Sequence, residues 1–298
     1  MSIEAKPFLK WAGGKGQLLN QLSRHLPNSI SKEPFTYIEP FVGGGAMLFH
    51  MLQHFDNIKK AVINDVNEDL MLTYRIIKED VEALITHLGK LEKEYLALSS
   101  QNERSQLFYE IRERYNQHIG KSIERASQLI FLNRTCFNGL FRVNKKGFFN
   151  VPFGKYANPT ICNAEVLRAD SQVLQSVDVE ICQGDYAQTL QYVDELTFVY
   201  LDPPYRPLDA TSSFTSYAKG DFNDDDQRVL VAFCHQLSER GCLWMESNAD
   251  CSAKNPEDTF FEELYRDYRI ERVYASRFIN ANPNKRGKLT ELLIKNYE

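Results

Sequence analysis

Phe198-Val199-Tyr200-Leu201-Asp202-Pro203-Pro204-Tyr205 is the stretch that decides the fold. Its apolar first half predicts a buried strand, which ends where Asp202 and the prolines begin. Neither proline has a backbone N–H, and each disfavours helix in the residue before it, so we expect an extended chain with unpaired carbonyls. A carboxylate, a bare carbonyl and the Tyr205 ring suit a planar ring that carries an amino group, such as adenine. Taken alone, the tetrapeptide also fits an aspartate N-cap followed by a proline turn.

Other short apolar segments predict neighbours for this strand in one sheet. Strands are expected at residues 36–39, 61–64 and 243–246, with a helix at about 45–55 between the first two. An amphipathic helix is expected between residues 223 and 240. This alternation is typical of an α/β protein with a Rossmann-like, doubly wound sheet.

The middle of the chain breaks the alternation. Residues 68–132 are rich in Leu, Ile, Glu, Lys and Arg and predict helices. Asn138-Gly139 and Lys146-Gly147 then predict the turns of a β-hairpin over 133–147. We therefore expect an inserted helical and β-hairpin module at residues 66–165, within a catalytic domain made of residues 1–65 and 166–298.

The formal net charge of −5 conceals a basic segment. From Arg112 to Lys155, nine basic residues stand against Glu113 and Glu124, so this segment carries +7 and the rest of the chain −12. Such asymmetry is typical of a surface that meets a phosphate backbone, although a basic helix face can also be merely solvated.

Several classes of protein are disfavoured by what the sequence contains. No apolar run approaches the roughly 18 to 20 residues of a membrane span, and residues 1–10 lack the apolar core of a signal peptide, so we expect a cytoplasmic protein with no membrane contact. The six cysteines form no Cys-x-x-Cys pair, which favours reduced, structural thiols. His50 and His54 share a helix face by spacing, but no third metal ligand is evident, and we expect no bound metal.

A glycine-rich segment near the amino end predicts a site for a nucleoside-type cofactor. Residues 41–46 follow one predicted strand and open a helix, where a parallel sheet presents backbone N–H groups to a ligand. Asp65 ends the next strand and can accept from both ribose hydroxyls, with a helix N-cap as its alternative role. Asp185 and Tyr186 follow a further strand-like segment and can read and stack on a cofactor ring, although a turn is the simpler interpretation.

A second glycine-rich segment, residues 8–15, lacks the spacing of a phosphate loop because Gly16, and not Ser or Thr, follows Lys15. This disfavours a nucleotide triphosphatase. Lys15 is better placed to hold a carboxylate, and Trp11 to pack on an aliphatic or sulfonium-bearing ligand, unless Trp11 is simply part of the core.

Six ordered motifs carry a resemblance to a known family: FLKWAGGK (8–15), EPFVGGGA (39–46), NDVN (64–67), NRTCFNGLFRVN (133–144), GDY (184–186) and DPPY (202–205). In these motifs the chain resembles the Dam-type DNA adenine-N6 methyltransferases over nearly its whole length. The resemblance implies S-adenosylmethionine as cofactor and double-stranded DNA as partner. We expect a monomer in solution, either solitary or paired with a restriction endonuclease.

The resemblance also implies roles for individual residues. The cofactor contacts fall on Trp11, Lys15, Asp65 and Asp202, supported by Phe41, Gly43, Gly45, Asp185 and Tyr186. Catalysis falls on Asp202, Pro203, Pro204 and Tyr205. The target adenine leaves the duplex and stacks on Tyr205, while Asp202 and the Pro203 carbonyl accept its amino hydrogens. Held out of the ring plane, these hydrogens free the N6 lone pair for direct in-line attack on the methyl group.

The implied DNA contacts are Lys10, Phe137, Asn138, Gly139, Leu140, Arg142 and Pro152. Phe137 stands where the family often has tyrosine, an aromatic that wedges into the duplex beside the displaced base. Arg142 suits the O6 and N7 atoms of guanine, Leu140 and Pro152 suit a thymine methyl, and Lys10 matches a residue near the first guanine. Together these residues imply the target GATC.

Two other functions stay open at this point. An RNA adenine methyltransferase would use a similar tetrapeptide, but it does not explain the FNGLFR segment. A DNA-binding regulator that has lost catalysis would not need Asp202, Trp11 and Lys15 intact.

Overall fold

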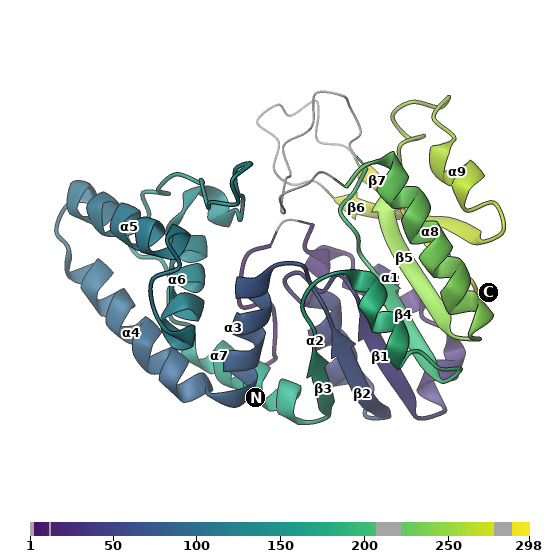
Figure 1. The fold of residues 1–298 in the computed structure, drawn as a ribbon, viewed down its shortest axis with the longest axis horizontal. Helices are drawn as coiled ribbons and strands as arrows, with labels where there is room; N and C mark the ends of the chain where they lie inside the picture. The colour runs from purple at the N-terminus through teal and green to yellow at the C-terminus, as the bar shows by residue number, and fades with distance from the viewer. Residues whose placement is uncertain (1–2, 12, 207–221, 277–287) are drawn as a thin grey trace.

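A seven-stranded sheet forms the centre of the larger part of the molecule in the computed structural model, which describes residues 3–11, 13–206, 222–276 and 288–298 (Figure 1). The strand order is β3-β2-β1-β4-β5-β7-β6. The strands are β1 (Phe35–Glu39), β2 (Ile58–Ile63), β3 (Asp178–Ile181), β4 (Thr197–Leu201), β5 (Leu243–Ala249), β6 (Arg269–Ser276) and β7 (Lys288–Lys295). Strands β1 to β5 pair in parallel, whereas β7 runs antiparallel to both β5 and β6.

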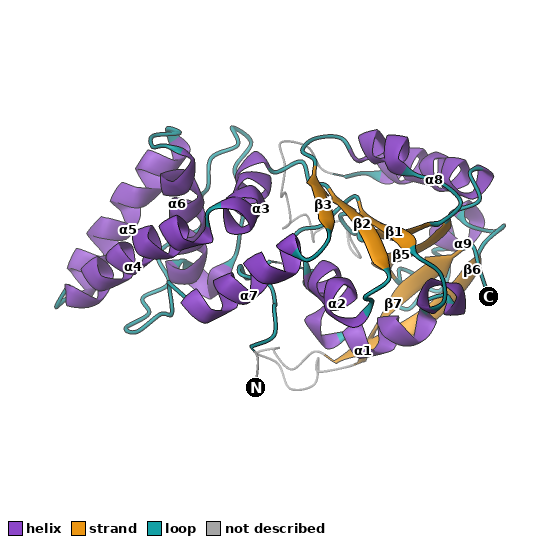
Figure 2. Cartoon of the chain, turned by 90° about the horizontal axis from the view of Figure 1, so that it is seen from below, coloured by secondary structure: helices purple, strands orange, loops and turns teal. Residues whose placement is uncertain are grey.

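The α-helices of the described chain are α1 (Leu19–Leu22), α2 (Ala46–His54), α3 (Glu68–Glu79), α4 (Val81–Ala97), α5 (Gln101–Asn116), α6 (Ser122–Thr135), α7 (Ala164–Gln175), α8 (Asp224–Glu239) and α9 (Phe260–Leu264). Helix α8 covers one face of the sheet, and α2 and α7 lie against the other (Figure 2). Helices α4, α5 and α6 stand beside the sheet as a separate layer (Figure 1).

Two hydrophobic clusters fix these positions, one on each face of the sheet. Val199 of β4 packs with Leu230 and Phe233 of α8, and Tyr37 of β1 packs with Met47 of α2. All five residues of β4 are buried, as expected for a central strand covered on both faces. The predicted doubly wound sheet is therefore confirmed.

The predicted hairpin is only partly correct. Residues 133–135 belong to the end of α6, and Asn138-Gly139 forms a 3-10 turn, η4 (Phe137–Gly139), and no hairpin turn. Both residues have left-handed backbone, with φ of 58° and 65°, which closes a tight turn that no ladder can continue. The Lys146-Gly147 turn is confirmed, since Gly147 N–H donates to the Asn144 carbonyl at 2.8 Å. It closes a short hairpin with a single bridge, Val143 to Phe149.

The helical segment shares a core with the sheet. The cluster that contains Tyr37 and Met47 also contains Phe108 of α5 and Phe131 of α6. Helices α3 and α4 of the expected module pack on α7, and α3 also contacts β3, so contacts cross the expected boundary near residue 165. The inserted module at 66–165 stays a prediction about chain organisation.

The remaining expectations concern the ends of the chain and its surface. The sequence predicts an antiparallel pair of strands over residues 268–276 and 290–297, joined by a polar, basic loop at 280–288. Strands β6 and β7 form this pair, whereas all of the loop except Lys288 lies outside the described residues. The six cysteines are free thiols. In the described ranges no helix is both long enough and apolar enough to cross a membrane.

Candidate active site

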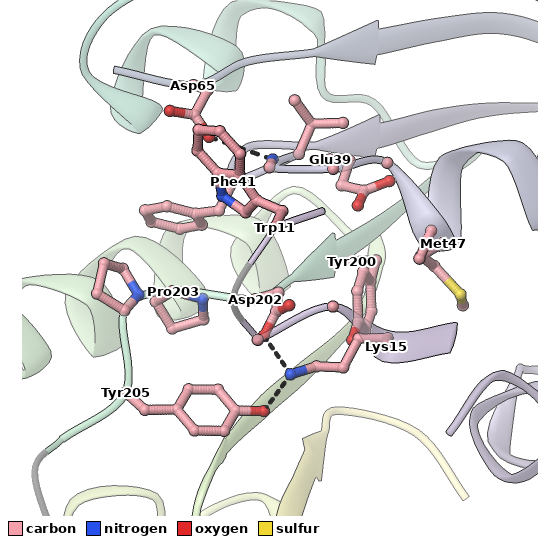
Figure 3. A pocket seen from close by; sticks show the side chains of 18 of the residues that line it. Trp11, Lys15, Glu39, Phe41, Met47, Asp65, Tyr200, Asp202, Pro203 and Tyr205 are labelled. Atoms are coloured by element: carbon pink, nitrogen blue, oxygen red, sulfur yellow. Dashed lines mark hydrogen bonds and ion pairs between the residues drawn. The ribbon is translucent and has the colours of Figure 1, made fainter. Parts of the chain in front are cut away.

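A cavity of about 1110 Å³ opens at the carboxyl edge of the sheet (Figure 3). It lies where the strand order reverses between β1 and β4, the position at which doubly wound sheets bind their ligands. The residues expected to contact a cofactor and those of the tetrapeptide all line it: Trp11, Lys15, Phe41, Gly43, Gly45, Asp65, Asp185, Tyr186, Asp202, Pro203, Pro204 and Tyr205. Residues up to 194 positions apart in sequence are thus brought to one site by the parallel strands.

The tetrapeptide follows β4 directly, and its Asp202 is held by a buried cation. Lys15 Nζ lies 2.9 Å from Asp202 Oδ1 and 3.5 Å from Glu291 Oε2. It also donates to the Tyr205 hydroxyl at 2.5 Å, and that hydroxyl donates to Glu291 Oε2 at 2.7 Å. Lys15 is only 4% exposed, so this network of two carboxylates, one ammonium and one phenol lies within the cavity wall.

Burial raises the pKa of Asp202 to about 6, although the ammonium of Lys15 opposes the rise. Glu291 raises it further because two negative charges share the site. The pKa of Tyr205 lies well above its usual value because of burial and the same two carboxylates, so its hydroxyl keeps its proton. At neutral pH the site therefore offers an ionised Asp202 oxygen and a neutral phenol.

The glycine loop and Asp65 contact each other. Asp65 Oδ2 accepts from Gly43 N–H at 3.2 Å, and Oδ1 accepts from Asn67 N–H at 2.9 Å. The N-cap of α3 is Asn67, whose side chain accepts from Leu70 N–H, so the alternative role of Asp65 as N-cap is wrong. Burial raises the pKa of Asp65, although hydrogen bonds from the backbone, those of Asn67 and Gly43 among them, oppose the rise.

Asn64, a buried residue that the sequence analysis did not single out, ties the loops at this edge together. Its Nδ2 donates to the carbonyls of Pro40 and Gly184, each at 3.0 Å, and its Oδ1 accepts from Gln188 at 2.8 Å. The loops after β1 and β3 are thereby fixed to the end of β2.

Phe41 and Tyr186 form an aromatic wall of the cavity, with ring centroids 4.9 Å apart. Asp185 caps the 3-10 helix η5 (Tyr186–Tyr192) by accepting from Ala187 N–H at 2.7 Å. The simpler interpretation of Asp185 as a turn residue therefore holds, and it is compatible with a place in the cavity wall.

The segment before Lys15 joins the cavity to the expected DNA-reading residues. Asn133 Oδ1 accepts from Lys10 N–H at 2.8 Å, and its Nδ2 donates to the carbonyls of Lys10 at 2.8 Å and Gly139 at 3.0 Å. A Cβ on Gly139 would collide with the Lys10 side chain, and the positive φ of 65° also favours glycine at this position. The Trp11 ring stacks on Phe141 at 5.0 Å.

The expected DNA contacts divide into one that lines the cavity and a group outside it. Lys10 lines the cavity. Phe137 and Leu140 present exposed apolar side chains, 52% and 38% accessible, and Asn138 and Pro152 are also exposed. Arg142 is half-buried, and its Nε donates to Asn150 Oδ1 at 2.8 Å, which orients the guanidinium. Gly139 is buried in the turn.

Four acidic residues in the cavity wall were not predicted, namely Glu39, Asp226, Asp250 and Glu291, and two of them, Glu39 and Glu291, lie on strands. Glu39 is buried at the end of β1 and accepts from the Tyr37 hydroxyl at 2.8 Å, and burial holds its pKa well above the usual value. Glu291 lies on β7 opposite Ala249, and the antiparallel direction of β7 brings it to the carboxyl edge. In both cases the available signal was an acid inside an apolar strand pattern. The described part of the chain contains no cluster of three or more residues able to hold a metal ion.

The strand order and the cavity at the switch point define a Rossmann-like, doubly wound α/β fold with a ligand site at the carboxyl edge of its sheet. A family model described as D12 class N6 adenine-specific DNA methyltransferase matches residues 11–279. Type II methyltransferase M.MjaIII of Methanocaldococcus jannaschii is 48% identical, with 99% of this chain and 100% of that protein covered. The DNA adenine methylases of Vibrio cholerae and Escherichia coli (strain K12) are 35% and 31% identical, with 97% of this chain and 95% and 94% of those proteins covered.

The chain therefore belongs to the D12 class N6 adenine-specific DNA methyltransferase family. It is an adenine-specific DNA methyltransferase, which decides against the RNA enzyme and the silent regulator as alternatives.

Proposed function

We propose that the protein transfers a methyl group from S-adenosylmethionine to adenine N6 within GATC, on a base swung out of the duplex. The observation that carries this proposal is the single cavity shared by the glycine loop, Asp65 and the Asp202-Pro203-Pro204-Tyr205 turn. Treating unmethylated genomic DNA with the purified protein and sequencing the methylated adenines tests it. We expect methyl groups to be incorporated only in the presence of S-adenosylmethionine and only at GATC. Methylation with another donor would reject the proposed cofactor, and methylation at another motif would reject the proposed target sequence.

The residues present fit S-adenosylmethionine. The cavity exceeds the roughly 300 to 1,000 Å³ usual for small-molecule sites, so it has room for a cofactor and a base together. A Cβ on Gly43 would lie 2.9 Å from Trp11, and one on Gly45 would lie 2.3 Å from the Tyr74 hydroxyl, so glycine keeps this wall open beside the aromatic rings. Asp65 would hold the ribose hydroxyls, and Phe41 and Tyr186 would contact the adenine ring. When bound, the cofactor supplies the electrophilic methyl group.

The chemical task of the chain is to orient the target amino group. The ionised Asp202 carboxylate accepts one N6 hydrogen and the Pro203 carbonyl accepts the other, which turns the nitrogen lone pair towards the methyl group. Tyr205, held through its hydroxyl by Glu291, offers its ring for stacking on the base. After transfer N6 carries a positive charge, and its proton is lost readily through Asp202.

The exposed residues around the η4 turn would meet DNA. Phe137 would fill the space that the displaced adenine leaves, while Arg142, Leu140, Pro152 and Lys10 would read the remaining bases. The segment that carries Lys10 and Lys15 connects the DNA-reading residues to the catalytic turn. Asn133 joins Lys10 to the η4 turn, and Lys15 contacts Asp202.

The pH dependence of kcat/KM should report the titration of Asp202. The carboxyl must be ionised to accept a hydrogen bond, and its pKa in the free enzyme is about 6. We therefore expect kcat/KM to be constant above pH 7 and to fall by about tenfold per pH unit well below pH 6. DNA affinity, measured separately across the same range, serves as the control. A profile that stays flat to pH 5 contradicts this role of Asp202.

The basic segment from Arg112 to Lys155 should make DNA affinity salt-dependent despite the acidic overall charge. Lys145 and Lys146 are exposed at the hairpin turn. We expect Lys146→Ala to reduce the slope of log Kd against log salt by about one, because one phosphate contact is lost. Lys59→Ala, an exposed lysine at the far end of β2, is the control. Equal slopes for the parent and Lys146→Ala would place this turn away from the DNA.

A further inference from the structure

A chain of fully buried amides runs from the catalytic turn into the core. Gln227 of α8 donates through Nε2 to the Pro204 carbonyl at 3.2 Å. Asn248 of β5 donates through Nδ2 to Gln227 Oε1 at 3.1 Å and to Glu246 Oε1 at 3.0 Å. Tyr265 closes the chain by donating to Glu246 Oε2 at 2.6 Å. None of Gln227, Glu246 and Asn248 has solvent-exposed surface.

The directions of the bonds from Asn248 through Gln227 to Pro204 are determined. Ala249 N–H, which can only donate, bonds to Asn248 Oδ1 at 2.9 Å, so the Asn248 nitrogen must face Gln227 and Glu246. Gln227 therefore presents its oxygen to Asn248 and its nitrogen to Pro204. A backbone carbonyl can only accept, so the Pro204 carbonyl also requires that the Gln227 nitrogen, and not its oxygen, faces it.

The turn needs such an external hold. Pro203 and Pro204 have no N–H, so two consecutive residues after β4 have no backbone donor to fix them. On the far side of Tyr205, Arg206 bonds to Asp224 at 2.8 Å and to Asp258 at 2.6 Å. Asp224 and Gln227 both belong to the first turn of α8, so this helix holds the tetrapeptide at Pro204 and the following residue at Arg206.

We propose that Gln227 is a positioning residue for methyl transfer: it fixes the Pro204 carbonyl and thereby the directions of the Pro203 carbonyl and the Tyr205 ring. The inference rests on the proposed function, because it concerns the geometry in which adenine N6 is held. A small rotation of the peptides after Pro203 would turn an acceptor away from the amino group, and misplacement of about 1 Å can cost about a hundredfold in rate.

The test compares Gln227→Met, which keeps size and removes the donor, with Gln227→Glu. Single-turnover methylation by Gln227→Met should be about ten- to hundredfold slower, with affinities for DNA and S-adenosylmethionine within about twofold of the parent. Gln227→Glu should retain more of the rate, because a fully buried carboxyl, joined to the acidic Glu246 through Asn248, stays protonated and can donate to Pro204. Gln236→Leu, an exposed position on α8, should behave as the parent.

Hydrogen exchange gives a measurement that does not depend on turnover. The Tyr205 and Arg206 amides should exchange about tenfold faster or more in Gln227→Met, with the sheet amides unchanged. Unchanged exchange and an unchanged single-turnover rate would overturn the proposal, and so would a loss of affinity for both ligands in step with the rate. A parent protein that methylates no DNA would instead reject the proposed function, while the exchange result would still decide whether Gln227 holds the turn.

Discussion

Asp202→Ala should lower the methylation rate by about a thousandfold or more and leave DNA affinity nearly unchanged. In the proposed function the ionised carboxylate accepts an N6 hydrogen of the target adenine, and removing one such group at a reacting atom typically costs about two to four powers of ten in rate. Asp202 lines the cavity 2.9 Å from Lys15, whereas Phe137 and Asn138 of the η4 turn, which would meet DNA, do not line it. Single-turnover methyl incorporation and DNA binding, measured side by side, separate the two effects.

Asp202→Ala leaves the buried ammonium of Lys15 without the Asp202 carboxylate, so the experiment includes control variants. Asp202→Asn keeps the shape of the side chain and should be nearly as slow, which would exclude a mere cavity effect. Asp178→Ala removes an exposed carboxylate that pairs with Lys60 on the same sheet, and it should act as the parent does. Turnover within tenfold of the parent in both Asp202 variants would refute the role given to this carboxylate.

The sheet was predictable because its strands are short, apolar and separated by clear helix signals. β4 and the end of β1 were found from such runs, and the tetrapeptide was found because prolines end a strand in a recognisable way. β2 begins at Ile58, earlier than expected, because Lys59 and Lys60 interrupt the apolar pattern although Ile58 is buried and pairs with Phe35. Backbone pairing with a neighbour, which the local pattern does not contain, sets that boundary.

The site residues that lie together in one sequence motif were predicted. Those that meet only through the packing of distant elements were missed. Asp202 and Tyr205 come from one motif, whereas Glu291 reaches Tyr205 only because β7 runs antiparallel beside β5. The same holds for Gln227 and Asn248, whose amides are ordinary in sequence and meet Pro204 only through the packing of α8. The η4 turn was mistaken for a hairpin because Asn-Gly serves both, and the Asn133 side chain stabilises the 3-10 form.

Arg142→Ala should relax the choice of target sequence about ten- to hundredfold. A bidentate arginine–guanine pair is worth roughly 1 to 3 kcal/mol of discrimination. The Arg142 guanidinium is oriented by Asn150 through Nε, which leaves its terminal nitrogens without a hydrogen bond to any residue that the structure describes. We expect the ratio of methylation at GATC to methylation at sites altered at one guanine to fall by that factor, mainly because altered sites are no longer disfavoured.

Lys146→Ala provides the contrast, because a phosphate contact carries no sequence information and its loss should weaken all sites alike. Competition between duplexes that differ at one base pair measures both variants in the same reaction, and sequencing of methylated genomic DNA identifies the altered position. Relaxation at one guanine with Arg142→Ala, together with unchanged ratios for Lys146→Ala, is the expected pattern. If the Arg142 variant is as selective as the parent, another residue reads this guanine. The exposed η4 turn and Lys10 are then the described groups that could contact it.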